Sequence, residues 1–403
     1  MATDYDAIIV GARCAGSPTA MQLARQGHRV LLVDRAEFPS DTLSTHLIHP
    51  PGVAALDRWG LLDHVVASGC PPIQRYSFDF GPFTIKGSPR AYEGHSTGYA
   101  PRRTVLDKIL VDGAREAGAE VREHFNVDEV VIEDGVVVGI RGHGKDGERV
   151  LERARVVIGA DGRNSHVAKA LETEEYNEKP RLQWSFYTYF SGLPVDGFEV
   201  RIRPSRAWAA ISTNDGLTLV VCGWPYAEAG TYKADVEANY LKTFELAPEF
   251  AERVKAAKRV EPFNGGAVPN FFRKPYGPGW ALVGDAGYNK DPITAMGITD
   301  AFRDVELCAT ALDETLTGAR SHDDAMADYQ RKRDGHVEPI YEFTTDLARL
   351  EPPPPETQQL LGAVHGNQEA MDDFVSVNAA TLSPAEFFAP DNIGRIMGAA
   401  ATR

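Results

Sequence analysis

Three segments place glycine directly after an apolar run, and two of them add an acidic residue. The first is Gly11-Ala12-Arg13-Cys14-Ala15-Gly16, which follows an apolar run that begins at Tyr5. The second is Gly159-Ala160-Asp161-Gly162, and the third is Gly284-Asp285-Ala286. Backbone N–H groups at such turns can bind phosphates, and carboxylates can accept hydrogen bonds from sugar hydroxyls. These segments therefore indicate the binding of a dinucleotide.

The first segment has the spacing of a dinucleotide-binding βαβ unit. A helix is expected from about residue 17 to 26, and the next apolar run ends at Asp34, 23 positions after Gly11. A spacing of about 20 is typical of such units. Glycine allows the tight turn, the N-terminus of the helix binds the pyrophosphate, and the acid binds a ribose hydroxyl. Arg13 replaces the middle glycine, and its guanidinium either binds a phosphate or is solvated.

The elements that must position these segments form two lobes. Apolar runs before the three turns predict buried strands, whereas residues 181–269 contain aromatic-rich strands that predict an antiparallel sheet with one helix at about 234–246. Alternation broken by Gly81-Pro82 predicts a hairpin. We therefore expect an α/β fold with a Rossmann-like nucleotide lobe and an interleaved substrate lobe. The expected boundaries are 1–72, 100–180 and 270–335 for the nucleotide lobe, 73–99 and 181–269 for the substrate lobe, and 336–403 for a helical C-terminal region.

Composition limits the classes of partner and compartment. The chain has 403 residues and a formal net charge of -15, which disfavours nucleic acid as a partner because phosphate neutralisation supplies most of that affinity. No apolar run approaches the roughly 20 residues of a membrane span. Asp4 and Asp6 stand where a signal peptide would carry bases, so we expect a cytoplasmic protein. Four dispersed cysteines predict neither a metal site nor a disulfide framework.

The ordered set of three motifs resembles the group A FAD-dependent monooxygenases, which are the p-hydroxybenzoate hydroxylase-like flavoproteins, with their relatives the flavin halogenases and geranylgeranyl reductases. The resemblance covers residues 5 to about 335. It implies a FAD-binding lobe of the glutathione-reductase type, FAD as the cofactor and NAD(P)H as a transient electron donor. We expect a monomer or homodimer.

The resemblance also assigns roles around FAD. It places Asp34 at the adenosine ribose, Arg35 beside the adenine, and Arg103, which opens an Arg-x-x-Leu-x-x-x-Leu helix, at the pyrophosphate or ribityl chain. Asp285 would accept a hydrogen bond from a ribityl hydroxyl or cap a helix, and Asp161 would lie between FAD and the pyridine nucleotide or cap a turn. The residues expected to contact FAD are Gly11, Ala12, Arg13, Ala15, Gly16, Asp34, Arg35, Ser44, Arg103, Val127, Asp161, Gly162, Gly284, Asp285, Pro292, Gly297, Ile298 and Thr299.

Departures from the family pattern leave the reaction open. The Trp-x-Trp-x-Ile-Pro motif of the halogenases is missing, and Gly223-Trp224-Pro225 only faintly matches the Tyr-x-Trp-x-Phe-Pro motif of the prenyl reductases. Our first expectation is NAD(P)H-dependent hydroxylation of a small, electron-rich, aromatic substrate by molecular oxygen through a flavin hydroperoxide. Reduction of an isoprenoid double bond is the alternative, and a non-catalytic flavin-binding redox module is the third possibility.

Candidate catalytic residues lie near the expected flavin. His46 follows Asp34-Arg35 in a loop that the family brings towards the flavin, and Pro292 falls beside the ring. Tyr187 is the third candidate. Tyr288 and Lys290 are weaker candidates because they only lie near the Gly-Asp motif. Aromatic residues that either line a substrate pocket or pack in the sheet are Tyr187, Tyr189, Phe190, Trp208 and Trp224.

Overall fold

The computed structural model describes residues 4–402, and its first layer is a mostly parallel sheet. The strand order is β19-β20-β10-β1-β2-β7, with β8 and β9 extending from β10. The strands are β1 (Tyr5–Val10), β2 (Val30–Val33), β7 (Glu120–Arg122), β8 (Asn126–Glu133), β9 (Val136–His143), β10 (Arg149–Gly159), β19 (Tyr276–Gly277) and β20 (Trp280–Leu282). Because β1, β10 and β20 are parallel neighbours, the three glycine turns that follow them lie at one edge of the sheet.

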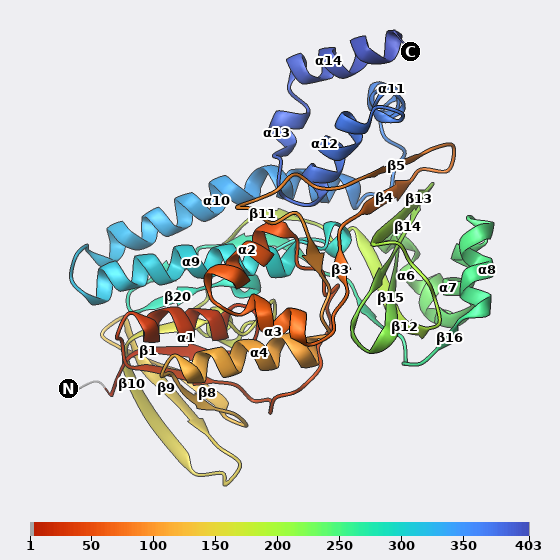
Figure 1. Cartoon of the computed structure of the whole chain (residues 1–403). Helices are drawn as coiled ribbons and strands as arrows, with labels where there is room; N and C mark the ends of the chain where they lie inside the picture. Colours follow the sequence, from red (N-terminus) through yellow and green to blue (C-terminus); the bar gives the residue numbers. More distant parts are fainter. Residues whose placement is uncertain (1–3, 403) are drawn as a thin grey trace.

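Helices cover one face of this sheet (Figure 1). They are α1 (Gly16–Arg25), α2 (Pro50–Arg58), α3 (Leu62–Ala67), α4 (Arg103–Glu116), α9 (Gly297–Leu316) and α10 (His322–Leu347). Alternate residues of β1 separate the two faces: Ala7 and Ile9 pack in the helical core, whereas Ile8 and Val10 pack towards β8, β9 and α5 (His166–Ala170). The hydrophobic alternation of the sequence therefore determines which face the helices cover.

The substrate lobe is an antiparallel sheet with one parallel pair. Its strand order is β16-β12-β15-β14-β13-β4-β5, with β17 also paired to β12, and β13 runs parallel to β4. The strands are β4 (Tyr76–Asp79), β5 (Thr84–Gly87), β12 (Gln183–Ser191), β13 (Phe198–Arg203), β14 (Arg206–Ser212), β15 (Leu217–Pro225), β16 (Lys258–Arg259) and β17 (Asn264–Gly266). The early hairpin and the later strands thus form one sheet. The α/β fold with an interleaved antiparallel lobe is confirmed.

One face of the substrate sheet packs against helices α6 (Ala229–Ala234), α7 (Val236–Phe244) and α8 (Pro248–Ala256). The sequence predicted a single helix at 234–246. This helix corresponds to α7, which begins at Val236 because the Asp235 side chain caps it by accepting a hydrogen bond from Ala238 N–H at 3.0 Å, whereas α6 and α8 were not predicted.

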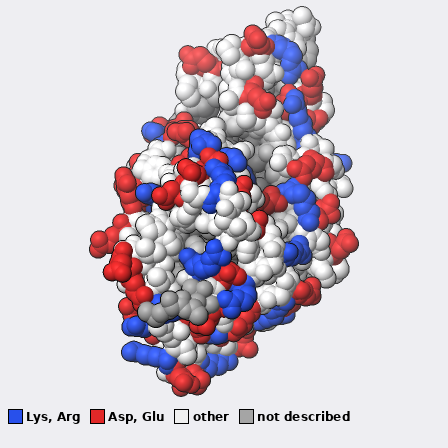
Figure 2. All heavy atoms as spheres, turned by 90° about the vertical axis from the view of Figure 1, so that its left-hand side faces the viewer, with Lys and Arg blue, Asp and Glu red and all other residues white. Residues whose placement is uncertain are grey.

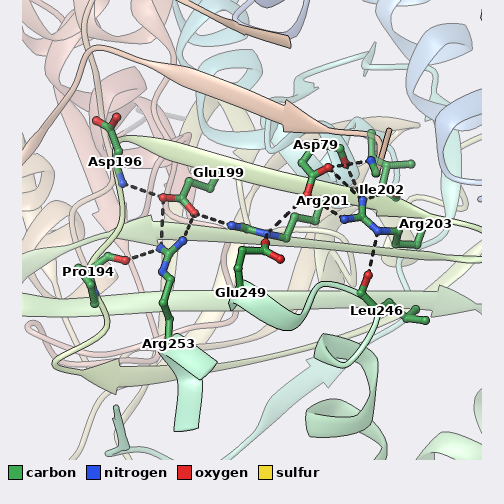
Figure 3. Close-up of polar contacts among 11 residues, drawn as sticks. Asp79, Pro194, Asp196, Glu199, Arg201, Ile202, Arg203, Leu246, Glu249 and Arg253 are labelled. Atoms are coloured by element: carbon green, nitrogen blue, oxygen red, sulfur yellow. Dashed lines mark hydrogen bonds and ion pairs between the residues drawn. The ribbon is translucent and has the colours of Figure 1, made fainter. Parts of the chain in front are cut away.

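A charged network joins α8 to strand β13 of this sheet (Figure 3). The Arg253 guanidinium of α8 donates to Glu199 of β13 at 3.0 and 3.2 Å. Arg201 lies between Glu199, at 3.1 Å, and Glu249, at 3.2 Å. Arg201 and Glu199 are both almost fully buried, whereas the Glu249 side chain is 59% and the Arg253 side chain 28% exposed, so the network joins the buried part of β13 to the surface of α8.

The C-terminal region is helical, as predicted, and rests on the hairpin β4–β5 (Figure 1). It consists of α11 (Pro355–Val364), α12 (Gln368–Asn378), α13 (Pro384–Phe387) and α14 (Pro390–Ala401). Smaller elements are β3 (Pro72–Ile73), β6 (Gly98–Tyr99), β11 (Glu175–Lys179), β18 (Asn270–Arg273), β21 (Tyr288–Asn289), η1 (Asn214–Gly216), η2 (Tyr226–Glu228), η3 (Gly284–Ala286) and η4 (Pro292–Thr294).

Two surface properties complete the description. Within residues 4–402, no helix has both the length and the apolar character needed to cross a membrane. On the face shown in Figure 2, acidic and basic side chains are interspersed, without a continuous patch of one sign.

Candidate active site

The first glycine turn has no space for a side chain at either of its two glycines, Gly11 and Gly16. Gly11 has a φ of 102°, and a Cβ on it would lie 2.5 Å from the carbonyl oxygen of Ala160. A Cβ on Gly16 would lie 1.7 Å from the carbonyl oxygen of Gly11. Side chains at these positions would therefore separate the turns that follow β1 and β10. The cradle predicted for a dinucleotide is present in the geometry of the backbone.

Asp34 holds this turn together. Its carboxylate accepts hydrogen bonds from the N–H groups of Ala12, at 2.7 Å, and Ala36, at 2.8 Å. The side chain is half-buried at the end of β2, and the adjacent Arg35 is exposed. Val127 is half-buried in β8. These positions are compatible with the predicted contacts to the adenosine part of FAD.

Arg13 and Arg103 share one buried carboxylate. Arg103, buried at the start of α4, donates from Nε and Nη2 to Asp107 Oδ1 at 3.0 and 2.8 Å. Arg13 donates from Nη1 to Asp107 Oδ2 at 2.5 Å. Burial opposes the charge of Arg103, but the attraction of Asp107 raises its pKa overall, so it stays cationic. The guanidinium of Arg13 is thus paired with an acid, and Asp107 is a residue that the sequence reasoning missed.

The two acidic turns differ in how their carboxylates are used. Asp161 caps α5 by accepting from His166 N–H at 2.6 Å and Val167 N–H at 3.2 Å. Asp285 makes no side-chain hydrogen bond within residues 4–402, and η3 has no side-chain cap. The Asp285 side chain is exposed to solvent. Desolvation by the surrounding protein nevertheless raises its pKa, and the positive charge of Arg103 partly opposes this rise. A carboxylate without a hydrogen bond within the described residues can accept one from a hydroxyl group of a ribityl chain.

The N-terminus of α9 supplies donors for the ring end of the site. Gly297 is exposed, and no acceptor within residues 4–402 takes a hydrogen bond from the backbone N–H of Gly297, Ile298 or Thr299. Pro292, at the start of η4, is half-buried beside them. A helix N-terminus stabilises negative charge, so this segment fits the pyrimidine edge of a reduced flavin.

Lys290 and Tyr288 are held within the protein core. Lys290 forms a hydrogen-bonded ion pair with Asp300, and both side chains are nearly fully buried. The ring of Tyr288 packs 4.7 Å from that of Phe272, measured between centroids. These contacts give both weaker candidates a structural role.

His46 forms a buried pair with Tyr189. The pair joins the loop after β2 to β12 through a short hydrogen bond between His46 Nε2 and the Tyr189 hydroxyl. His46 is fully buried with a φ of 64°, and its Nδ1 has no partner within the described residues. Burial, followed by the charges of Arg103 and Arg102, lowers the pKa of His46 to about 3. The imidazole is therefore neutral at physiological pH.

Tyr187 borders the same loop. Desolvation raises the pKa of Tyr187 to about 12, against a hydrogen bond with the backbone of Ser44. Its ring stands edge-on to His46 at a centroid distance of 6.3 Å. The Ser44 hydroxyl accepts a hydrogen bond from His46 N–H at 3.0 Å. The structure thus brings together His46, Tyr187 and Ser44 as predicted candidates, and adds Tyr189 as the direct partner of the histidine.

A second histidine–tyrosine pair lies three positions further along. His49 Nδ1 bonds the Tyr76 hydroxyl and Nε2 bonds the Thr294 carbonyl, each at 3.1 Å. His49 N–H also donates to Thr299 Oγ1 at 3.0 Å. Both ring nitrogens are satisfied, so this pair joins β4 to the segment before α9. In the sequence, the presence of a second histidine in the loop is the one signal that could have indicated this pair.

Three of the aromatic residues considered for a substrate pocket face away from the site. Tyr187 pairs with Val221, which pairs with Ala209, so all three share the face towards His46. Trp208, one residue earlier, therefore points to the opposite face. Phe190, Trp208 and Trp224 pack in the core beneath α7 and α8, and Trp224 Nε1 donates to Thr243 Oγ1 at 3.0 Å. The packing interpretation applies to these three residues.

Comparison with known proteins identifies the family. The model of the family described as "FAD binding domain" matches residues 4–344. The chain belongs to this family. This family includes the group A flavin monooxygenases that the motifs resemble. The predicted family and the prediction of a FAD-dependent oxidoreductase are therefore both confirmed.

Relatives carry several reactions. A digeranylgeranylglycerophospholipid reductase of Methanocella arvoryzae is 31% identical over 320 residues, covering 75% of each chain. Reductase 1 of Methanopyrus kandleri is 28% identical over 362 residues, 86% of this chain and 89% of the relative. A 6-methylpretetramide 4-monooxygenase of Streptomyces rimosus is 27% identical over 331 residues, 77% of this chain and 76% of the relative.

Solved structures support the fold alone. The myxobacterial chondrochloren halogenase CndH superposes with a TM-score of 0.80 at 22% identity, covering 99% of this chain and 97% of the other. The flavin-dependent brominase Bmp2 gives a TM-score of 0.81 at 17% identity, with 99% and 98% coverage. The second lobe and C-terminal helices therefore belong to a known arrangement of this fold.

Proposed function

We propose that this protein is a FAD-dependent reductase that saturates carbon–carbon double bonds of an isoprenoid-type substrate, with NAD(P)H as electron donor. The observation that carries the proposal is the similarity over most of the chain to relatives named as digeranylgeranylglycerophospholipid reductases. Tyr187 and Tyr189 belong to a packed apolar core that extends to the C-terminal helices, so both rings lie among apolar neighbours.

The relatives named as reductases agree with this choice. They are 26–31% identical to the chain over 75–86% of its length. The sequence motifs alone placed hydroxylation first, and these relatives favour the alternative.

FAD, when bound, supplies the two-electron reduction. Saturation of a double bond also needs a proton, and the His46–Tyr189 pair holds exchangeable protons on neutral atoms. Burial raises the pKa of Tyr189 well above its ordinary value, so its hydroxyl remains protonated at physiological pH. The tyrosine can deliver its proton, and the Nε2–H group of His46 can stabilise the remaining tyrosinate through the shared hydrogen bond until a proton from solvent replaces the one lost. Apolar neighbours exclude water from this transfer.

The proposal is tested by NAD(P)H oxidation over a panel of polyprenyl compounds and phenols, with and without oxygen. We expect substrate-dependent oxidation that continues without oxygen, with product masses raised by two units per bond reduced. Oxidation that requires oxygen and yields products heavier by one oxygen atom would overturn it.

Hydroxylation of an aromatic substrate is a second candidate, and two observations favour it. Trp224, within the weak match to the prenyl reductase motif, faces α7. The Streptomyces rimosus relative is a monooxygenase by name. The oxygen requirement in the same experiment separates the two candidates.

A further inference from the structure

Asp107 is the centre of a buried ionic cluster beside the first glycine turn. It is fully buried on α4 and accepts hydrogen bonds from two guanidinium groups, those of Arg13 and Arg103. The thiol of Cys14 also donates to it, at 3.6 Å. Two cations on one carboxylate leave one excess positive charge next to the N-terminus of α1. That charge and the helix N-terminus both favour a bound anion.

Arg13 also contacts the loop formed by residues 38–46. Its Nη2 donates to Ser40 Oγ at 3.0 Å, and longer bonds of 3.4 Å reach the carbonyl oxygens of Ser40 and Asp41. Its guanidinium carbon lies 5.3 Å from the centre of the Phe38 ring. One side chain therefore joins the glycine turn, α4 and the loop.

Contacts that do not involve Arg13 hold the two ends of the loop: Phe38 N–H donates to Glu123 at 3.3 Å, and His46 bonds Tyr189. Residues 40–47 contain no helix or strand. Two of its hydrogen bonds are internal, from Thr42 N–H to Asp41 and from His46 N–H to Ser44. An ion pair of 3.7 Å joins Asp41 to Arg102. The same loop carries Ser44 and His46 to the ring end of the site. Its conformation at Ser40 and Asp41 thus depends largely on a residue of the phosphate-binding turn.

We propose that Arg13 is a positioning residue that couples occupancy of the FAD pyrophosphate site to the conformation of residues 38–46. A bound anion balances the excess charge on the Asp107 cluster and so holds Arg13 against the loop. Without Arg13, Asp107 neutralises Arg103 alone, the attraction for the pyrophosphate falls, and the loop loses its anchor. Because such coupling is reciprocal, loosening the loop must also weaken FAD binding by a comparable factor. The inference rests on FAD binding and is independent of the reaction catalysed.

Two variants separate coupling from a direct phosphate contact. Arg13→Gly restores the glycine of the dinucleotide pattern and removes the anchor. Ser40→Ala removes only the loop side of the contact and leaves Arg13, Asp107 and Arg103 in place. Arg141→Ala is the control, since this exposed arginine pairs with Glu129 at 3.3 Å on the distant β8–β9 hairpin. Each protein is prepared without cofactor, its unfolding temperature is measured, and FAD affinity is determined by quenching of flavin fluorescence.

Hydrogen exchange of the peptide that contains residues 38–46 is measured with and without FAD. In the wild type we expect FAD to slow this exchange at least fivefold. Arg13→Gly should raise the FAD dissociation constant about tenfold and abolish that slowing, and Ser40→Ala should raise the constant about threefold, on the scale of one lost hydrogen bond. Arg141→Ala should match the wild type. A weaker affinity in Arg13→Gly with an unchanged exchange response, or an unchanged affinity in Ser40→Ala, would overturn the coupling.

Discussion

The two histidine–tyrosine pairs allow a sharp test of proton transfer. In Tyr189→Phe, the His46 ring loses the one side-chain hydrogen bond that it makes within residues 4–402, whereas in Tyr76→Phe the His49 ring keeps its bond to Thr294. Each variant removes one buried hydroxyl and retains the aromatic ring. The rings of both pairs are stacked at a centroid distance of 5.8 Å, so the loss of packing is matched.

The expected magnitudes follow from these contacts. Leaving a buried polar atom unpaired costs about 1–3 kcal/mol, so both variants should lower the free energy of unfolding by about that amount. Loss of a general acid lowers turnover by about 10²–10⁴-fold, and we expect this loss in Tyr189→Phe alone. Tyr76→Phe should change kcat by less than about fivefold, since His49 has both nitrogens committed to structure.

The assay combines urea unfolding with the kinetics of flavin reoxidation by substrate. Flavin reduction and FAD affinity should stay close to wild type in both variants, because neither hydroxyl contacts the predicted FAD-binding residues. Equal losses of kcat in the two variants, or full turnover in Tyr189→Phe, would refute a role for Tyr189 in proton transfer.

Three further perturbations address FAD binding and stability. Asp285→Ala should raise the FAD dissociation constant by about 10–100-fold, which is the range expected for the loss of a hydrogen bond to a charged group. The control is Asp313→Ala, on the half-exposed end of α9, which should leave the constant unchanged. Unchanged FAD affinity in Asp285→Ala would show that Asp285 does not belong to the site. Arg201→Met removes one cation of the network in Figure 3, but Arg253 still pairs with Glu199 and Glu249 is more than half exposed, so unfolding in urea should show a loss of about 1–3 kcal/mol with FAD affinity retained. Burial lowers the pKa of His46 to about 3 and that of His49 to about 4. Below about pH 6.5 each histidine therefore binds a proton in the unfolded chain but not in the folded protein. Each should lower the free energy of unfolding by about 1.4 kcal/mol per pH unit, until the pH reaches its folded pKa. Burial raises the pKa of Asp291 to about 7 and that of Asp304 to about 6, so these two carboxyl groups make the folded protein more stable as the pH falls. The wild type is therefore compared with a His46→Gln/His49→Gln variant, in which both carboxyl groups remain. An identical pH dependence of stability in the two proteins would contradict the assignment.

The sequence was sufficient to predict the fold because the three glycine turns each follow an apolar strand. Their order along the chain, together with the spacing from Gly11 to Asp34, specifies parallel neighbours whose turns meet at one edge. The turn glycines Gly11 and Gly16 were recognised from their spacing, whereas the close approach of Ala160 to Gly11 could not be predicted from it. The exact lobe boundaries stay a prediction.

Contacts between distant segments were beyond the reach of the sequence. Arg13 pairs with Asp107 because α4 lies beside the turn after β1, and His46 pairs with Tyr189 because β12 lies beside the loop after β2. The orientation of Trp208 depends on strand register, and a shift of one residue would turn it towards His46. Asp235 is a helix-capping residue type, and its cap explains why α7 begins at Val236, whereas the preceding helix α6 was not predicted.

The central claim is that reduced FAD in this protein passes its electrons to a carbon–carbon double bond. The most direct measurement reduces the bound flavin without oxygen, adds a polyprenyl substrate, and follows flavin absorbance together with product mass in a single turnover. We expect the oxidised flavin spectrum to return without oxygen, with a product two mass units heavier. A flavin that stays reduced until oxygen is admitted, followed by a product that contains one added oxygen atom, would contradict the claim.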